Sequence, residues 1–488
     1  MVLSRKTQWY KPLVLSVTAA AYILWLWVFL WCADQWRAEP AQITAVSILG
    51  TVTVAVYALL WWRLLGHLLT PYHIFLAFFT VFGFGQCILW AFGIHTDAEI
   101  GRKLVFSTLS AEPLLILRGQ LLFWICFVTF NCGAMLVWSG KARQKEEPLS
   151  VSQPEDPRWQ YLYQTAFLLS VAVIPVSLYR AACKMLLSLE YGYSSLYYGV
   201  AAQVIKDPLS EILSTMLFPC LLGLLLGSRF RKGVRIAAYC VFFTFSVMTL
   251  LGGDRGEWIN LLLFLLLAEH LCNRPIGGKR MAVLAVAAIA VLAVTNAVVS
   301  LRNAGLSWDG FVAALLSWDS NPIVSMLTEF GHSMGISLLL LADPVTFPYG
   351  NTYWMTIPTL FGTGLGNRLF GMEYVQLHTW FPQSLGISYG TDFSMIGEAV
   401  LNCGVYAAPL VLLLEGMVIG KVTQLPWLRR TGPLGLCLSI SVMVFAVNLA
   451  RSTVWLVANR VIWMLILFPL VYGLVKLLSE RRQALWIS

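Results

Sequence analysis

The sequence predicts an all-α integral membrane protein with about 12 transmembrane helices, and three observations lead to that prediction. Of the 488 residues, 58% are hydrophobic and only 12% are charged, against about 45–50% and 25% in soluble domains. The mean hydropathy is +0.74 over the whole chain. Apolar runs of about 20 residues, the length that crosses a bilayer, recur from end to end. These values exclude a soluble nucleotide-fold enzyme and a secreted disulfide scaffold.

The apolar runs place the membrane spans in order along the chain. The first run follows Arg5, Lys6 and Lys11, and at about 20 residues it is long for a cleaved signal peptide, so we expect a retained helix. With both termini in the cytoplasm, most of the 33 lysines and arginines fall on the cytoplasmic side, as orientation rules require. The predicted spans lie near residues 12–33, 42–63, 72–94, 114–138, 160–183, 208–228, 234–251, 256–272, 281–299, 394–420, 432–449 and 452–475.

The longest interruption of the apolar pattern divides the chain into three parts. Residues 1–299 hold about nine helices, residues 300–393 form a long outer loop, and residues 394–488 hold about three helices. The loop is rich in Trp, Gly, Pro and Tyr, a composition that argues against disorder, and long ordered loops are usually functional. We expect this loop to carry short helices on the periplasmic side.

Cysteine, histidine and net charge exclude several kinds of site. The ten cysteines form no C-x-x-C pair, and the six histidines form no ligand-spaced pair, so neither a disulfide framework nor a metal site is predicted. The net charge of +9 follows membrane orientation, so a nucleic-acid partner is not expected. The glycines at 362, 364 and 366 lack the G-x-G-x-x-G spacing of a phosphate loop and predict a turn.

Arginines on the outer face are candidates for binding an anion. In the turn at 251–258, Asp254, Arg255 and Glu257 place three charges in four residues. The carboxylates there either hold Arg255 toward an anionic substrate or simply neutralise a hairpin. Arg302 lies just beyond the ninth predicted span, also on the outer face.

The last predicted span has one polar face. At 100° per residue, Asn448, Arg451 and Asn459 fall within an arc of about 100°, with Arg460 on its flank. An intramembrane arginine costs about 2.5–3.5 kcal/mol on insertion scales, so such residues are usually kept for a substrate or ion path. The alternative is a structural ion pair with a carboxylate of another helix.

Two short segments offer acid–base groups. Glu329 and His332 are three residues apart on a predicted helix that begins at Pro322, so they share a face and could share a proton. Glu398 enters the next span about two turns from its start, as a base or as a partner of Arg451. A surface helix with an incidental Glu and His would show the same spacing.

Several motifs taken together resemble the Wzy family of O-antigen, or oligosaccharide repeat-unit, polymerases. The resemblance covers most of the chain, including the helix number and the single long outer loop. The motifs are Gly-Tyr-Ser-Ser-Leu-Tyr at 192–197, Arg-Gly-Glu at 255–257, Asn-Pro-Ile at 321–323 followed by Glu329-x-Gly331-x-Ser333, Phe-Pro-Tyr-Gly-Asn-Thr-Tyr at 347–353, and Gly397-Glu398 with Asn402-x-Gly404.

The resemblance implies a glycosyltransferase of GT-C architecture in the bacterial inner membrane, with its active site on the periplasmic side and with neither a metal nor another cofactor. Such an enzyme transfers a growing glycan from undecaprenyl pyrophosphate to the non-reducing end of a new lipid-linked repeat unit. Its implied partners are these lipid-linked glycans, membrane lipids and a chain-length-regulating membrane protein.

This reaction suits the residues already named. Guanidinium groups bind a pyrophosphate and stabilise the charge that develops as it leaves. The acceptor hydroxyl needs a positioned base, and Glu329 is the first candidate, ahead of His332 and Glu398. Aromatic side chains of the outer loop could stack on sugars, among them Trp308, Trp318, Tyr349, Tyr353, Trp354, Tyr374 and Trp380.

Two other functions remain open from sequence. An O-antigen ligase, or another glycosyltransferase that uses polyprenyl-linked sugars, has similar architecture and the same kind of donor. A transporter or flippase for an anionic or lipid-linked solute could line its path with Arg451 and Arg460. A transporter, however, needs polar residues through the full bilayer depth, and here they gather toward one face.

Overall fold

The computed structural model describes the protein over residues 10–35, 38–66, 68–138, 156–191, 207–253, 256–301, 309–310, 312–313, 321–371, 375–387, 393–424 and 432–487. These residues are nearly all helical, and the part of the chain so described contains no β-strand, only isolated bridges at Ile100–Lys103 and Val105–Leu109. Within these described ranges, eleven helices are long and apolar enough to cross a membrane. The prediction of an all-α, multi-pass membrane protein is therefore confirmed.

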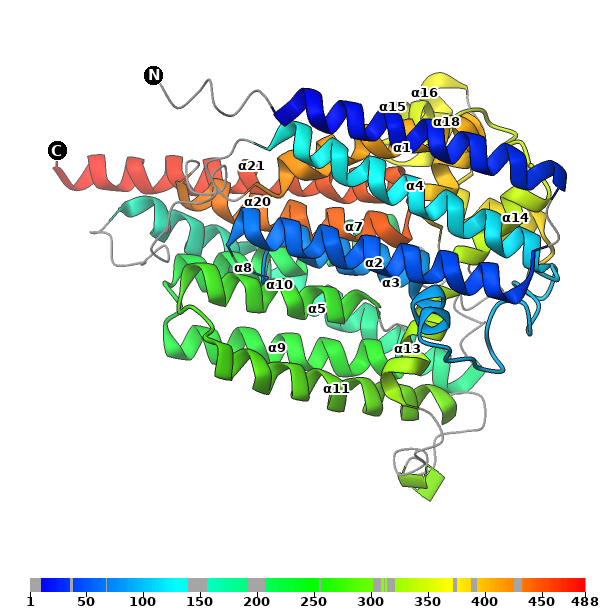
Figure 1. Ribbon diagram of the computed structural model, residues 1–488. Helices are drawn as coiled ribbons and strands as arrows, with labels where there is room; N and C mark the ends of the chain where they lie inside the picture. Colours follow the sequence, from blue (N-terminus) through cyan, green and yellow to red (C-terminus); the bar gives the residue numbers. More distant parts are fainter. Residues whose placement is uncertain are drawn as a thin grey trace. The chain divides into compact units, whose positions relative to one another are not determined.

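The helices divide between two compact units. Unit 1 consists of Met1–Gln144, Ile323–Gln424 and Ala446–Ala458, and unit 2 of Lys145–Pro322, Leu425–Phe445 and Asn459–Ser488. Figure 1 colours the helices along the chain, with bounds α1 (Tyr10–Gln35), α2 (Pro40–Leu65), α3 (Pro71–Ala91), α4 (Pro113–Val137), α5 (Pro157–Tyr191), α7 (Pro208–Thr215), α8 (Leu217–Gly227), α9 (Lys232–Leu251), α10 (Gly256–Cys272), α11 (Gly278–Leu301), α13 (Pro322–Gly331), α14 (Met334–Ala342), α15 (Thr352–Thr359), α16 (Thr363–Phe370), α17 (Leu377–Ser384), α18 (Met395–Val422), α20 (Gly432–Val447), the 3₁₀ turn η4 (Asn448–Arg451) and α21 (Val454–Ile487).

In unit 1, α4 packs against α18 more extensively than any other pair of helices. Small residues allow the close approach, because a Cβ at Gly133 would collide with the Leu413 backbone and a Cβ at Gly416 with the Phe130 backbone. Such small-residue contacts replace the hydrophobic effect as the driving force between helices in a bilayer. Helices α1 and α2 also lie along α4.

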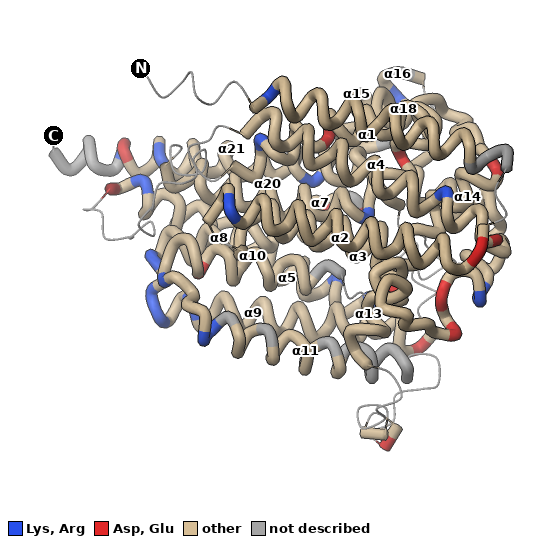
Figure 2. Tube along the Cα trace, in the orientation of Figure 1, with Lys and Arg blue, Asp and Glu red and all other residues tan. Residues whose placement is uncertain are grey.

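Charged residues lie at both ends of unit 1. Lys11 lies in the first turn of α1, and Arg63 and Lys421 lie in the last turns of α2 and α18. The start of α1 meets the end of α4, since the Tyr10 hydroxyl donates to the Trp138 carbonyl over 2.9 Å. The α3–α4 connection at the other end carries acidic residues, seen as red segments in Figure 2, together with Arg102 and Lys103. This end is the outer one if the basic end is cytoplasmic.

The outer loop predicted at residues 300–393 differs from the structure in one respect. Helices α13 and α14 together give a 21-residue segment, Pro322–Ala342, that is long and apolar enough to cross a membrane. Glu329 and His332 interrupt its apolar pattern, which is why a search for unbroken apolar runs passes over it. In the other direction, the predicted span at 256–272 corresponds to the shorter helix α10.

Candidate functional site

The helical path breaks between α20 and α21, and Arg451 lies at this break, in unit 1. The chain leaves α20 through the 3₁₀ turn η4, and Ser452 is extended (φ −144°, ψ −171°) before α21 begins at Val454. The prediction of one continuous helical face from Asn448 to Asn459 is therefore wrong, because the first two of its polar residues lie in η4. Side-chain spacing on an ideal helix does not carry across such a break.

Two aromatic rings hold the Arg451 guanidinium. Its central carbon lies 5.1 Å from the centre of the Phe82 ring and 5.8 Å from that of Phe330. The two rings are 5.2 Å apart. Distances below about 6 Å allow cation–π attraction, which strengthens where water is excluded. These two ring contacts help to fix the position of the half-buried arginine.

The position of Phe330 depends on close packing of α13 against α3. A Cβ on Gly85 would lie 2.7 Å from the Leu327 carbonyl oxygen, and one on Gly331 would lie 2.5 Å from the Gln86 nitrogen. The buried Gln86 amide donates to the Thr328 carbonyl over 2.7 Å and accepts from the Ile100 nitrogen over 2.8 Å. Two glycines and one glutamine therefore fix the position of α13 against α3, and with it the position of Phe330 beside Arg451.

Glu329 and His332 lie on this same segment. Glu329 is exposed, and it directly precedes the phenylalanine that contacts Arg451. His332 is half-buried in the turn that follows, with its ring edge-on to Phe106 at 5.6 Å. Its backbone nitrogen donates to the Glu329 carbonyl over 3.2 Å, which continues α13 as a single turn.

Glu398 is fully buried, and the chain itself uses both of its carboxylate oxygens. One oxygen accepts from the Thr352 hydroxyl and the other from the Val454 backbone nitrogen, each over 2.8 Å. Val454 is the first residue of α21, where unsatisfied N–H groups favour a negative charge. Glu398 therefore joins α18, α15 and α21.

Asn402 adds two hydrogen bonds to the contacts of Glu398 with Thr352 and Val454, and we call this set of contacts the clasp. Its amide oxygen accepts from the Thr352 nitrogen over 2.7 Å, and its amide nitrogen donates to the Thr352 hydroxyl over 2.6 Å. Two residues later, Gly404 bends α18 with a backbone conformation (φ 79°, ψ 167°) that favours glycine. The Gly397-Glu398 and Asn402-x-Gly404 pattern thus specifies a bent helix with a polar clasp at its start.

Tyr353 reaches deeper into unit 1. Its hydroxyl donates to a carboxylate oxygen of Glu415 in α18 over 3.3 Å. Burial, followed by the Glu415 and Glu398 carboxylates, raises the pKa of Tyr353 above its ordinary value, so this hydroxyl remains a donor. Glu415 was missed from sequence, although a carboxylate within an apolar run is a signal of a functional or structural partner.

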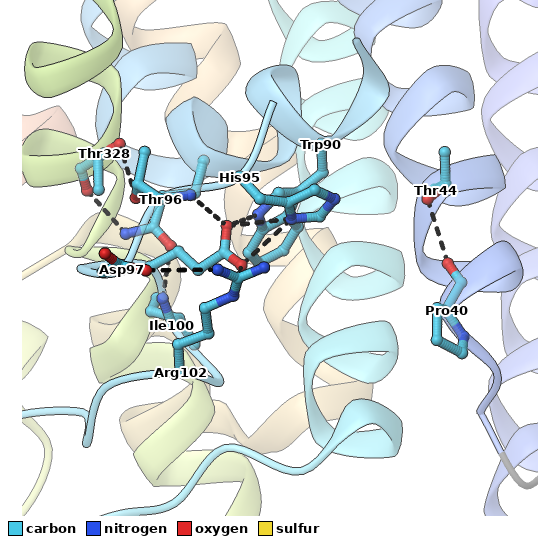
Figure 3. A network of polar contacts seen from close by, with 11 residues as sticks. Pro40, Thr44, Trp90, His95, Thr96, Asp97, Ile100, Arg102 and Thr328 are labelled. Atoms are coloured by element: carbon cyan, nitrogen blue, oxygen red, sulfur yellow. Dashed lines mark hydrogen bonds and ion pairs between the residues drawn. The ribbon is translucent and has the colours of Figure 1, made fainter. Parts of the chain in front are cut away.

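A second polar cluster lies in the α3–α4 connection at the same end (Figure 3). The buried carboxylate of Glu99 accepts from the Trp90 indole over 2.7 Å and pairs with the Arg102 guanidinium over 2.9 Å. The His95 ring and the Thr96 nitrogen lie within hydrogen-bond distance of the same carboxylate. This cluster was missed from the sequence, although His95, Glu99 and Arg102 follow one another at three- and four-residue spacing.

Six of the predicted site residues come together in unit 1. They are Glu329, His332, Glu398, Tyr353, Asn448 and Arg451. Arg460 lies in the part of α21 that belongs to unit 2, and Glu257 lies in α10 of unit 2. Asp254, Arg255 and Arg302, and the side chain of Glu257, lie outside the residues that the structure describes.

The aromatic candidates fall into three groups. Tyr349 and Trp380 pack edge-on against Phe347, at 5.4 and 5.0 Å. Trp354 is 73% exposed, so its ring face is open. Trp308, Trp318 and Tyr374 lie outside the described residues.

The residues that could hold a metal are also limited. Over the ranges that the structure describes, no three His, Cys, Asp or Glu side chains cluster as metal ligands. This end of unit 1 offers the Arg451 guanidinium, held between two rings, and the Glu329 carboxylate and His332 imidazole on one short stretch of chain. These groups can bind an anion and accept a proton.

Comparison with known proteins gives one family. No curated protein and no solved structure matches this chain. A family model described as O-antigen polysaccharide polymerase Wzy matches residues 21–480, nearly the whole chain. The chain therefore belongs to the O-antigen polysaccharide polymerase Wzy family.

Proposed function

We propose that this protein joins oligosaccharide repeat units carried on undecaprenyl pyrophosphate, on the periplasmic face of the bacterial inner membrane. Its family supports the role of polysaccharide polymerase. The observation that carries the proposal further is the Arg451 guanidinium, which is held between Phe82 and Phe330. The exposed Glu329 directly precedes Phe330 in the chain. The basic residues at the opposite end of unit 1 favour a periplasmic position for this site and cytoplasmic termini.

In the proposed reaction, Glu329 takes the proton from a hydroxyl at the non-reducing end of a new lipid-linked unit. That oxygen forms a bond to the anomeric carbon of the growing glycan, and the bond from this carbon to the pyrophosphate oxygen breaks. The electron pair leaves with undecaprenyl pyrophosphate. Arg451 stabilises the charge that accumulates there, with a strength that depends on its being fixed beforehand.

The other residues take different roles in this proposal. Glu398 acts as a positioning residue, because both of its oxygens already accept hydrogen bonds from the chain. Tyr353, next to Thr352, and Asn448, the first residue of η4, remain predicted substrate-binding residues, and His332 is a second candidate for the base. Arg255, Arg302 and Arg460 remain predicted ligands of the pyrophosphate, and Asp254 and Glu257 remain the carboxylates predicted to hold Arg255 in place.

We expect the chain's own residues to perform this chemistry with neither a metal nor another cofactor. A glycosyl pyrophosphate already contains a good leaving group, so bond cleavage needs charge stabilisation more than activation. A chain-length-regulating membrane protein is the further partner that we expect beside the lipid-linked substrates.

The test is the ladder of surface glycan on a gel from cells that lack the gene, with and without plasmid-borne variants. Loss of the gene should reduce the ladder to one repeat unit, and the wild-type gene should restore it. A general base contributes about 10²- to 10⁴-fold to rate. Glu329→Gln should therefore abolish visible extension at an unchanged protein level, and Arg451→Ala should do the same.

Matched controls come from the same unit. Asp343→Asn removes an exposed carboxylate at the end of α14, and Arg368→Ala removes an exposed guanidinium in α16. Both should keep a normal ladder. A normal ladder with Glu329→Gln overturns its role as the base. Loss of every glycan band without the gene indicates a ligase or flippase, and an unchanged ladder excludes a polymerase.

A further inference from the structure

Unit 2 contains an apolar groove between α5, α8 and α9 with a volume of about 370 Å³. Its lining is almost entirely hydrocarbon, with Ser170 and Tyr163 as the polar exceptions. Two small residues, Ala237 and Ala238, stand between Val234 and Val241 on the α9 wall and leave the space open. None of its lining residues is among those assigned above to the glycan-polymerising site.

One end of the groove is closed by the contact of α5 with α8. A Cβ on Gly227, at the end of α8, would lie 2.5 Å from the Tyr163 nitrogen. From Tyr163 to Pro175, the α5 wall rises by 12 residue steps, or about 18 Å at 1.5 Å per residue. This length is close to half of the roughly 30 Å hydrocarbon core. The groove therefore matches the depth of one lipid leaflet.

Three cations surround this closed end. Arg229, Arg231 and Lys232 lie in the turn from α8 to α9 and are exposed, and none pairs with a carboxylate among the described residues. We call them the basic collar. The next basic residue, Arg235, lies 4.0 Å from Glu269 and is not included.

The turn holds the collar in a fixed arrangement. Arg229 and Phe230 both have positive φ, at 53° and 54°, a backbone conformation that residues other than glycine rarely adopt. Phe230 is buried and anchors the reversal, and the Phe230 nitrogen donates to the Leu225 carbonyl over 2.8 Å. Orientation in the membrane needs positive charge at this end, but it does not need a strained, anchored turn beside a groove.

We propose that the groove binds one acyl chain of an anionic phospholipid whose headgroup phosphate lies against the basic collar. The chain fills the apolar walls to the depth of one leaflet, and the collar supplies guanidinium and ammonium donors to the phosphate. Basic pockets between membrane helices on the cytoplasmic side favour anionic headgroups in this way. A polyprenyl substrate fits less well, because its charged group would lie at the outer end. The proposal does not depend on the polymerase reaction.

The test measures lipid retained by the purified full-length protein in detergent, by native mass spectrometry. The probes are phosphatidylglycerol and phosphatidylcholine with identical acyl chains. The wild-type protein should retain phosphatidylglycerol at least 10-fold better. Replacing Arg229, Arg231 and Lys232 together by Ala should weaken phosphatidylglycerol retention by about 100-fold and phosphatidylcholine retention little.

Two further variants separate the headgroup from the chain. Ala237→Phe narrows the groove at an exposed position, and it should lower retention of both lipids while the collar stays intact. The matched control replaces Lys11, Arg63 and Lys421 by Ala, which removes the same charge from unit 1, and should retain phosphatidylglycerol normally.

Three results would overturn the proposal. Equal retention of both lipids by the wild-type protein indicates ordinary boundary lipid. An equal loss in the control variant indicates attraction by net charge alone. Displacement of phosphatidylglycerol by undecaprenyl phosphate at a lower concentration than by added phosphatidylglycerol assigns the groove to the prenyl chain instead.

Discussion

Two glutamates of unit 1 lie in opposite surroundings, although both belong to motifs that carry the resemblance to the Wzy family. Glu398 at the start of α18 is fully buried, and its oxygens accept from Thr352 and from the first residue of α21. Glu329 on α13 is exposed beside the aromatic residues that hold Arg451. One carboxylate is committed to joining three helices, and the other remains accessible to a substrate.

This difference indicates which glutamate supports the fold and which can take part in the reaction, although the two residues are of the same type. A general base must come within hydrogen-bond reach of the proton that it removes. A carboxylate whose oxygens are already engaged by the chain would first have to release those partners, leaving a buried hydroxyl and a buried N–H unpaired. We therefore expect variants of Glu398 to lose stability and variants of Glu329 to lose activity.

The largest expected effect is that of Glu398→Ala. It removes the acceptor of the Thr352 hydroxyl and of the Val454 nitrogen, and each buried donor left unpaired costs about 1–3 kcal/mol. Thermal unfolding of the purified protein in detergent should show a markedly lower midpoint. Glu398→Gln keeps the shape and one acceptor and should lose less. A Glu398→Ala protein with normal stability and no polymerisation would assign Glu398 to the chemistry and remove the distinction.

A smaller effect is expected for Gly331→Ala. Its Cβ would lie 2.5 Å from the Gln86 nitrogen, so α13 must move away from α3 at a cost of about 1–3 kcal/mol. The shift carries Phe330 away from Arg451. The glycan chains on the gel should therefore become much shorter, while the thermal unfolding midpoint of the protein should fall only moderately. The control is Gly364→Ala on α16, where nothing lies within 4 Å of the new Cβ. If polymerisation survives Gly331→Ala, the position of α13 against α3 does not matter to the site.

Much of the fold could be predicted from the sequence, because a bilayer rewards long apolar runs directly. The spans predicted near 72–94 and 114–138 correspond closely to α3 and α4. The failures occur where polar residues interrupt a run, as Glu329 and His332 do in Pro322–Ala342, or where the backbone breaks at Ser452. Both features depend on packing and hydrogen bonds from elsewhere in the chain, which run length does not report.

The candidate site could be predicted only one residue at a time. Arg451 and Glu329 stand out because charged residues near a membrane boundary are costly and rare. Their environment could not be predicted, since Phe82 lies far from Arg451 in the sequence and is an ordinary apolar residue in an ordinary apolar run. The clasp of Glu398 was equally hidden, because its partners are a threonine and a backbone nitrogen.

The smallest expected effect is that of Arg102→Ala, which tests a case between the two glutamates. Glu99 is buried like Glu398, but its charged partner Arg102 is 52% exposed at the side chain. Exposed members of ion pairs contribute about 0.2–1 kcal/mol, and Glu99 keeps the Trp90 indole and the Thr96 nitrogen as donors. Thermal unfolding should therefore show only a slight loss, one that grows smaller in high salt. Glu99→Ala should lose more, because the buried indole N–H is left unpaired. If Arg102→Ala instead lost as much stability as Glu99→Ala, the cluster would depend on its ion pair. The number of carboxylate oxygens that accept hydrogen bonds from the chain would then no longer identify the carboxylates of unit 1 that support the fold.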